Sequence, residues 1–571
     1  MKLIIREYLA SLRERGELDA VLPDLLSQLG LNVYSRPARG TRQDGVDVGA
    51  VGSLDGGSDS VYLFAIKPGD LTRKDWDGDS VQSLRPSLNE ILDAYIPNRI
   101  PVEHRGKQIV ICAVIGGDVQ EQVRPQLTGF TQQHTTTAVK FEEWNGDKLA
   151  SLIQSHFLRE DLLPSGARSL LRKSLALIDE PDVSYRHFSA LVRSLSVAIT
   201  AKSGDQVRIL RQISICLWIL FSWAREAGNT ESAYLSGEFA LLNAWNIAKH
   251  YAGECTKEAE AIAGAFSSVF RAYTQICTQF LSDILPHVGK LHALSTAVRP
   301  SCGLDVNLKL FDLIGRIATA GIWACWGSLH SAKDQPEFNQ AMLNEAAGYD
   351  LAVKALIVNN PILLLPVKDD QATDISIALL LLARDRHNYD DIRSWLTEML
   401  NRSAFALQVN GRYPCVLGSY ADLLLHPKRD DAEYRKNVTS ASVLYPLIAL
   451  YSAFIGDLEN YSHVARVKKE QLQHCNFQLW YPNDGSEECF YTNSDLHGVA
   501  LSDINAEQSA EELLAQVFGE CERSPQFNDL TAVRNGWWPL IVIACRHYRL
   551  PLPIHLLKRW RDGESTGNGT A

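Results

Sequence analysis

Residues 36–70 read RPARGTRQDGVDVGAVGSLDGGSDSVYLFAIKPGD, and this stretch decides the fold of the N-terminal region. Two apolar runs, Asp47–Gly52 and Val61–Lys67, flank a cluster of glycine, serine and aspartate. This pattern is typical of a β-hairpin with a glycine-rich turn. Because side chains alternate along a strand, positions 65 and 67 are expected on the same face of the second strand.

The predicted hairpin brings two chemically useful side chains together, Asp47 at the start of one strand and Lys67 at the end of the other. Hydrolysis of a phosphodiester with a divalent ion needs a carboxylate to hold the metal. It also needs a nearby lysine to orient or activate water and to offset negative charge. Spacing alone is equally consistent with Asp47 as an ordinary aspartate beside a turn. The two residues are therefore a candidate pair whose surroundings decide between the interpretations.

The same stretch is locally basic. Three arginines, Arg36, Arg39 and Arg42, precede the hairpin, and Arg73 and Lys74 follow it. The formal net charge of -11 argues against a protein whose whole surface wraps nucleic acid, since phosphate binding relies on clustered cations. A local basic patch could still contact DNA, and these five residues are the candidates for it. A solvated basic loop explains the pattern equally well.

The chain changes character near residue 160. Before it, strand-like and helical segments alternate; after it, apolar residues recur at helical spacing. A chain of 571 residues also exceeds the roughly 250–300 residues of a single core. We predict an α/β domain over residues 1–160, followed by a large all-α region. That region divides into helical domains over 161–360 and 361–562, either separate or continuous, and a tail over 563–571.

In this context the N-terminal region resembles the Mrr-like branch of the PD-(D/E)xK, or restriction-endonuclease, superfamily. LDAVLPDLLSQLGLNVY looks like the first helix and strand of that family, DGVDVGAV like its metal-binding strand, and FAIK like its third strand. IVICAVIGGDVQEQVRPQL and AVKFEEWNGDKLASLI resemble its later elements, so the likeness covers roughly residues 15–155. It implies a restriction-endonuclease-like α/β fold and a DNA endonuclease that uses Mg²⁺ or Mn²⁺.

The resemblance implies roles for individual residues. Asp47 corresponds to the metal-binding acid and Lys67 to the catalytic lysine, and Asp19 falls where the family often has glutamate. Ala65 departs from the pattern, because the family has glutamate or glutamine there. Either another acid supplies the missing metal ligand, with Asp19 and Asp44 the nearest candidates, or the domain has lost catalysis.

A second departure is Pro23, which is expected to interrupt the first helix and to change the direction of Asp19. Three functional hypotheses follow. The chain is a DNA-cleaving effector of a prokaryotic restriction or anti-phage defence system, whose helical region senses a trigger, oligomerises or docks a partner. Alternatively, it is a degenerate nuclease fold that binds nucleic acid or a partner, or a helical scaffold subunit of a multiprotein complex.

Other features of the sequence indicate the cellular location of the protein and the contacts it makes. Eleven cysteines include no CxxC pair, so neither a zinc site nor a disulfide framework is indicated. The N-terminus MKLIIREYLASLRERG is charged and amphipathic rather than signal-like, and the apolar run Ile213–Trp223 is shorter than the ~18–20 residues of a spanning helix. We expect a cytoplasmic protein that binds DNA, oligomerises or binds a partner protein, and does not contact a membrane.

Overall fold

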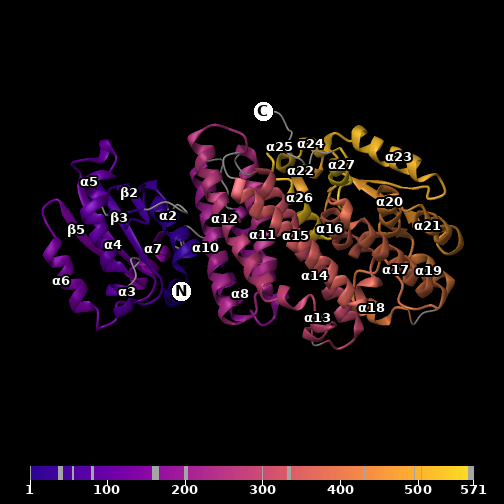
Figure 1. Ribbon diagram of the computed structural model, residues 1–571, viewed down its shortest axis with the longest axis horizontal. Helices are drawn as coiled ribbons and strands as arrows, with labels where there is room; N and C mark the ends of the chain where they lie inside the picture. Colours follow the sequence, from indigo (N-terminus) through magenta and orange to yellow (C-terminus); the bar gives the residue numbers. More distant parts are fainter. Residues whose placement is uncertain are drawn as a thin grey trace. The chain divides into compact units, whose positions relative to one another are not determined.

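The computed structural model describes residues 2–36, 43–54, 57–78, 83–156, 166–197, 203–298, 300–330, 336–427, 431–493, 495–502 and 504–562. Arg39, Arg42 and the predicted tail at 563–571 lie outside these residues. The N-terminal region contains a small mixed sheet, and the remainder is predominantly helical (Figure 1). The predicted change from an α/β region to a large helical region is therefore confirmed at this level.

The N-terminal sheet has five strands in the order β1-β2-β3-β4-β5. They are β1 (Asn32–Ser35), β2 (Val48–Gly52), β3 (Ser60–Lys67), β4 (Gln108–Ile115) and β5 (Val139–Trp144). The pairs β1/β2 and β2/β3 are antiparallel, and the pairs β3/β4 and β4/β5 are parallel. The β2–β3 register runs from Val48 opposite Phe64 to Gly52 opposite Ser60, which confirms the predicted hairpin.

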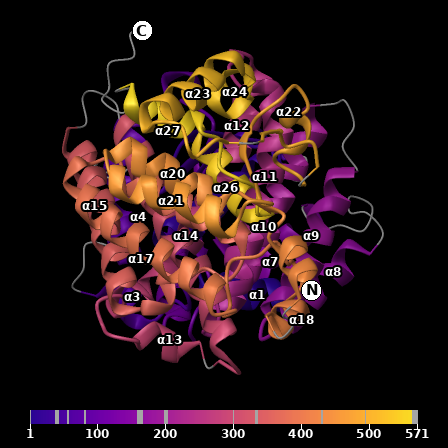
Figure 2. The same ribbon diagram turned by 90° about the vertical axis from the view of Figure 1, so that its right-hand side faces the viewer.

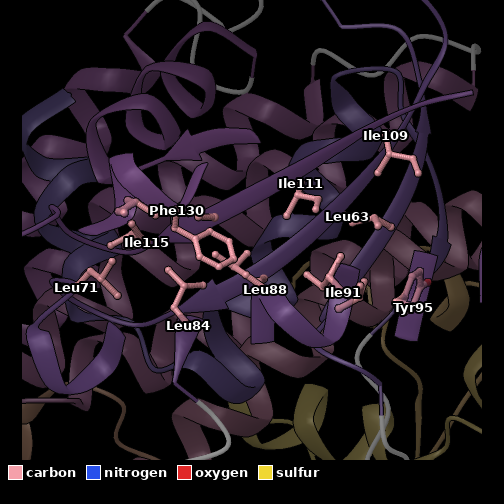
Figure 3. Packing of buried hydrophobic residues seen from close by; sticks show 14 of the residues in the cluster. Leu63, Leu71, Leu84, Leu88, Ile91, Tyr95, Ile109, Ile111, Ile115 and Phe130 are labelled. Carbon is pink, nitrogen blue, oxygen red and sulfur yellow. The ribbon is translucent and has the colours of Figure 1, made fainter. Parts of the chain in front are cut away.

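One face of the sheet packs on a hydrophobic core formed with α3 (Arg73–Asp77), α4 (Leu84–Glu90), the π-helical turn η2 (Ile91–Tyr95) and α6 (Arg124–His134). Figure 3 shows Leu84 and Leu88 of α4 beside the strand residues Leu63 and Ile111. Val61, Leu63 and Ala65, which alternate along β3, belong to this core, as the period of two requires. The sheet therefore has a rigid base from which Lys67 extends at the end of β3.

The other helical elements described in the N-terminal part are α1 (Lys2–Ser11), the π-helical turn η1 (Glu14–Leu18), α2 (Asp19–Gln28), α5 (Ile96–Asn98), the 3-10 turn η3 (Val102–His104) and α7 (Gly146–His156). Pro23 lies inside α2, so the expected interruption of the helix there is wrong. Proline provides no N–H for the carbonyl of Asp19, four residues earlier. The π-helical turn η1 ends at Leu18, and α2 begins at the next residue, Asp19, so the helix continues without a break.

The chain forms two compact units, residues 1–276 and 277–571. The first contains the sheet and further helices, and the boundary falls inside α12. These helices are α8 (Ala167–Ala176), α9 (Pro181–Val197), α10 (Ser203–Glu226), α11 (Glu231–Ala248) and α12 (Lys257–Ser282). The predicted domain boundaries at 160 and 360 stay predictions.

The second unit is mainly helical, and α20 lies beside α21 in it (Figure 2). Its α-helices are α13 (Ala293–Ala297), α14 (Gly303–His330), α15 (Pro336–Asn359), α16 (Ala372–Leu382), α17 (Tyr389–Gln408), α18 (Tyr420–Leu425), α19 (Ala432–Val438), α20 (Leu444–Ile455), α21 (Leu458–Gln471), α22 (Ser486–Cys489), α23 (Ala510–Arg523), α24 (Gln526–Asp529), α25 (Thr531–Arg534), α26 (Pro539–Tyr548) and α27 (His555–Arg561).

Two small sheets correct the prediction that this region is all-α. The strands β6 (Ala441–Ser442) and β7 (Asn476–Phe477) pair in parallel, and β8 (Leu479–Tyr481) pairs antiparallel with β9 (Val499–Leu501). Strands of two or three residues are too short to show a period of two in the sequence. They were therefore not predictable from residue patterns.

The helix α10 contains the apolar run Ile213–Trp223. Its residues Asp205–Glu226 form the one helix, among the residues described, that is long and apolar enough to cross a membrane. Of its most apolar window, 78% is buried within the structure, and buried core helices pass the same test of length and composition. The sequence analysis underestimated the length of this helix, because the helix extends beyond the uninterrupted apolar run at both ends.

Candidate active site

A tight turn places Asp47 at the start of β2. Asp44 and Gly45 both adopt left-handed backbone conformations, with φ of 47° and 81°. A Cβ atom at Gly45 would lie 2.1 Å from the carbonyl oxygen of Ser87, so this position has room for glycine alone. The Asp44 carboxylate pairs with Arg99, at 2.6 Å between Oδ2 and Nε. This ion pair fixes the turn.

Asp47 is held across the hairpin by two hydrogen bonds. Its backbone N–H donates to the carbonyl of Phe64 at 2.9 Å, and its Oδ2 accepts from the N–H of Ile66 at 2.7 Å. Within the described residues this is the one hydrogen bond of the carboxylate, so Oδ1 remains available for another ligand. The Asp47 carboxylate therefore contacts the backbone of Ile66, the residue directly before Lys67.

Two further acids lie near enough for their charges to act on this carboxylate. The pKa of Asp47 is raised to about 6, chiefly by burial; the Ile66 N–H and the Lys67 ammonium oppose the increase, and the charges of Glu14 and Asp19 add to it. Lys67 is nearly buried, with 7% of its side chain exposed, and its Nζ lies 3.5 Å from Glu14 Oε2. Asp47 and the three charged residues that act on it, Glu14, Asp19 and Lys67, make up the candidate site.

The π-helical turn η1 explains how Glu14 joins Asp19. The N–H of Asp19 donates to the carbonyl of Glu14, five residues earlier. Residues five apart lie on roughly the same side of a π-helix, whereas in an α-helix they point in different directions. Sequence reasoning missed Glu14 for this reason, because an α-helical interpretation of residues 14–19 separates the two carboxylates.

Ala65 belongs to the core and not to the site. It is fully buried, and it packs in the cluster formed by β3, β4 and the helices over them. Across the parallel pair its partner is Ala113, itself a small core residue. Residue 65 therefore contributes no polar group to the surroundings of Asp47 and Lys67.

Of the five residues in the predicted basic patch, the structure describes Arg36, Arg73 and Lys74. Arg36 is exposed, and its charge acts on Asp24 and Arg211. Burial raises the pKa of Asp24 and lowers that of Arg211, and the positive charge of Arg36 lowers both. Arg73 and Lys74 are exposed in the first turn of α3.

The donor set is suited to a small divalent cation. Carboxylate oxygens are the protein ligands that Mg²⁺ prefers, and Mg²⁺ commonly keeps several waters when one or two carboxylates bind it. Within the described part of the chain, no group of three or more His, Cys, Asp or Glu side chains lies close enough to form a complete metal cage. Asp47 with Glu14 or Asp19 fits the partly hydrated arrangement. Comparisons of the chain with protein-family models, curated proteins and solved structures find no match.

Proposed function

We propose that the N-terminal region is a metal-dependent deoxyribonuclease of the Mrr-like restriction-endonuclease type. In this proposal the whole chain is an effector of a prokaryotic restriction or anti-phage defence system. The observation that carries the proposal is the contact of the Asp47 carboxylate with the backbone of Ile66, directly beside the nearly buried Lys67. An aspartate that only stabilises the hairpin does not require a lysine beside it. A hydrolytic site needs both groups at the end of one hairpin.

Each side chain has a role in this proposal. Asp47 binds Mg²⁺ or Mn²⁺ through the oxygen that Ile66 does not occupy. Glu14 and Asp19 provide the second acidic position that Ala65 leaves vacant. The Lys67 ammonium orients the attacking water and offsets charge on the scissile phosphate. The bound cation would supply Lewis-acid polarisation of the phosphate and would lower the pKa of water.

A second candidate function is a degenerate nuclease fold that binds nucleic acid or a partner without cutting. Two observations favour it: Ala65 is packed in the core, and the described residues contain no group of three metal-ligating side chains. Both proposals share the fold, and they differ in whether Asp47 binds a divalent ion. Metal binding and cleavage must therefore be measured separately.

The test uses the full-length protein with supercoiled plasmid DNA and Mg²⁺ or Mn²⁺. We expect cleavage that is lost in Asp47→Asn, Lys67→Met and Glu14→Gln, together with a metal-dependent increase in melting temperature that is lost in Asp47→Asn. Asp44→Asn is the matched control. Asparagine tolerates the left-handed backbone at that position, and Asp44 lies in an ion pair with Arg99 outside the acid–lysine group.

The outcomes separate the two functions. Cleavage and metal stabilisation that both depend on Asp47 support the nuclease. DNA left intact under both metals, with an unchanged melting temperature, refutes the nuclease and favours the degenerate binding module. Equal loss of cleavage in Asp44→Asn would refute the assignment of the site to Glu14, Asp19, Asp47 and Lys67.

A further inference from the structure

The second unit contains a cavity of about 250 Å³ where five separate segments meet. These are the start of α16, residues 415–417, the start of α20, the β7–β8 segment, and the chain just after α26. The cavity is smaller than the ~300–1,000 Å³ of sites for drug-sized ligands. It therefore suits a compact ligand of nucleotide size or less.

One wall of the cavity is ionic. Lys368 Nζ lies 2.6 Å from Asp370 Oδ2, and Arg549 lies 3.6 Å from Asp370 Oδ1. Arg549 also donates to Asp374 at 2.7 Å and to the carbonyl of Asp370 at 3.0 Å. Asp370 therefore bridges two cations. In the described residues Lys368 makes a single ion pair, so most of its three N–H donors remain for a ligand.

Charged side chains continue behind this wall. Arg549 donates to the buried Asp374, and Asp312 and Arg546 lie close enough for their charges to act on Asp374. Arg546 in turn pairs with Asp312. The position of Arg549 is therefore held from behind, and its guanidinium is fixed at the edge of the cavity.

The Asp369 carboxylate is satisfied by donors other than Lys368 and Arg549. Its carboxylate accepts hydrogen bonds from the Ser442 hydroxyl and from the N–H groups of Val443 and Leu444 at the start of α20. It therefore stabilises the N-terminus of this helix. Lys368 and Arg549 remain as the cations that face the cavity.

Other lining residues of the cavity are apolar or aromatic. Val416, Leu417 and Pro551 line it together with Trp480. The Trp480 indole stacks on His497, with ring centroids 4.8 Å apart and planes at 25°, so its orientation is fixed. Gln478, two residues before Trp480, also lines the cavity and offers an amide donor and acceptor. An aromatic wall with one amide is suited to a flat ring that carries hydrogen-bonding groups.

We propose that this cavity binds a small molecule that combines a planar ring with one anionic group, the anion at Lys368 and Arg549 and the ring along Trp480. Two sources share this chemistry, a nucleoside 5′-monophosphate and an aromatic carboxylate. The site is independent of the proposed nuclease, whose residues all belong to the first unit.

Isothermal titration calorimetry on the full-length protein tests the proposal. The probes are the four ribonucleoside 5′-monophosphates and indole-3-acetate. Adenosine provides a ring without an anion, and ribose 5-phosphate provides an anion without a ring. We expect one of the complete molecules to bind at least about tenfold more tightly than either half. Tighter binding of a nucleotide or of indole-3-acetate then identifies the source.

Substitutions of lining residues test whether the ligand binds in this cavity. Lys368→Met and Trp480→Ala are expected to weaken the preferred ligand by about tenfold or more, while Trp480→Phe retains the ring and retains affinity. Lys354→Met is the matched control, because Lys354 pairs with Asp391 and does not line this cavity. Binding of no probe at millimolar concentration, or an affinity in Lys368→Met and Trp480→Ala that is unchanged from wild type, overturns the proposal. A fold check by circular dichroism accompanies each variant, and Trp480→Phe keeps the test decisive if Trp480→Ala is unfolded.

Discussion

Glu17 and Arg225 form an ion pair with 2.7 Å between Oε1 and Nη1, and only 3% and 16% of their side chains are exposed. Glu17 belongs to the π-helical turn η1, between the site acids Glu14 and Asp19, and Arg225 lies in the last turn of α10. The second oxygen of Glu17 accepts the N–H of Arg13 at 2.9 Å. The helix α10 therefore secures the turn that carries two of the site carboxylates.

Arg225→Met is expected to destabilise the first unit by about 3 kcal/mol, because it leaves the Glu17 carboxylate buried without its partner. Urea denaturation followed by far-ultraviolet circular dichroism measures the loss. Since Glu14 lies in the same turn, the variant should also weaken Mg²⁺ binding.

The matched control is Arg85→Met. Arg85 pairs with Asp77 at 2.8 Å, but both side chains are about half exposed (48% and 49%), so the cost should stay below ~1 kcal/mol. The double variant Glu17→Gln with Arg225→Met should recover part of the loss. Equal costs for the buried and the exposed pair would contradict the role given to Arg225.

Asp47→Asn is expected to stabilise the metal-free protein at neutral pH. Burial raises the pKa of Asp47 from its ordinary 3.8 to about 6, so ionised Asp47 lowers the free energy of unfolding, by ~3 kcal/mol above pH 6. Asparagine keeps an oxygen for the Ile66 N–H and removes the charge. The folded wild-type protein gains its proton first as the pH falls, so the advantage of the variant should shrink between about pH 6 and 4.

Denaturant titrations of both proteins across this pH range provide the measurement. Asp77→Asn, at an exposed carboxylate, is the control and should give no comparable gain. A difference between Asp47→Asn and wild type that stays constant with pH would show that the carboxylate is not strained by burial.

Ala65→Glu is expected to unfold or strongly destabilise the domain instead of completing the site. Ala65 has no exposed surface and packs among apolar side chains, so a glutamate there would bury a charge at a cost of several kcal/mol. Thermal unfolding and plasmid cleavage are the measurements. Ala65→Met adds similar bulk without charge and should cost ~1–3 kcal/mol. A stable Ala65→Glu protein with increased cleavage would place residue 65 in the site.

Gly45→Ala should destabilise the turn before Asp47 by more than backbone strain alone. Its Cβ would meet the Ser87 carbonyl oxygen at 2.1 Å, and φ is +81°. Gly30 has a similar φ of +86° with no atom within 4 Å of an added Cβ, so Gly30→Ala should cost only the ~1–2 kcal/mol of the left-handed conformation. The difference between the two melting temperatures isolates the contact with Ser87. Equal losses would mean that the turn can move away from α4.

The hairpin was predictable because local rules decide it. Alternating apolar residues and a glycine-rich turn define β2 and β3, and the same pattern identifies Asp47 and Lys67 as neighbours. The position of Ala65 was also readable as a departure from the family pattern. Its burial in the core depends on the helices above the sheet, which hairpin residues do not specify.

Glu14 and the ion pairs Asp44–Arg99 and Glu17–Arg225 were not predictable from the sequence. They depend on backbone geometry and packing that the spacing of apolar residues does not encode. Glu14 reaches the site through a π-helical turn, and Asp44, close to Asp47 in sequence, turns to Arg99 because of its left-handed backbone. Arg225 contacts Glu17 across 208 residues of sequence. Pairings over such separations follow from packing between elements.

The contact between Lys67 and Glu14 means that the site carries its own counter-ion. The ammonium group partly neutralises the neighbouring carboxylates. If the site binds Mg²⁺ as proposed, binding would be an exchange, in which Glu14 would pass from a monovalent partner within the chain to a divalent one from solution. Such an exchange would discriminate by charge, because a monovalent ion such as Na⁺ would offer nothing that Lys67 does not already supply.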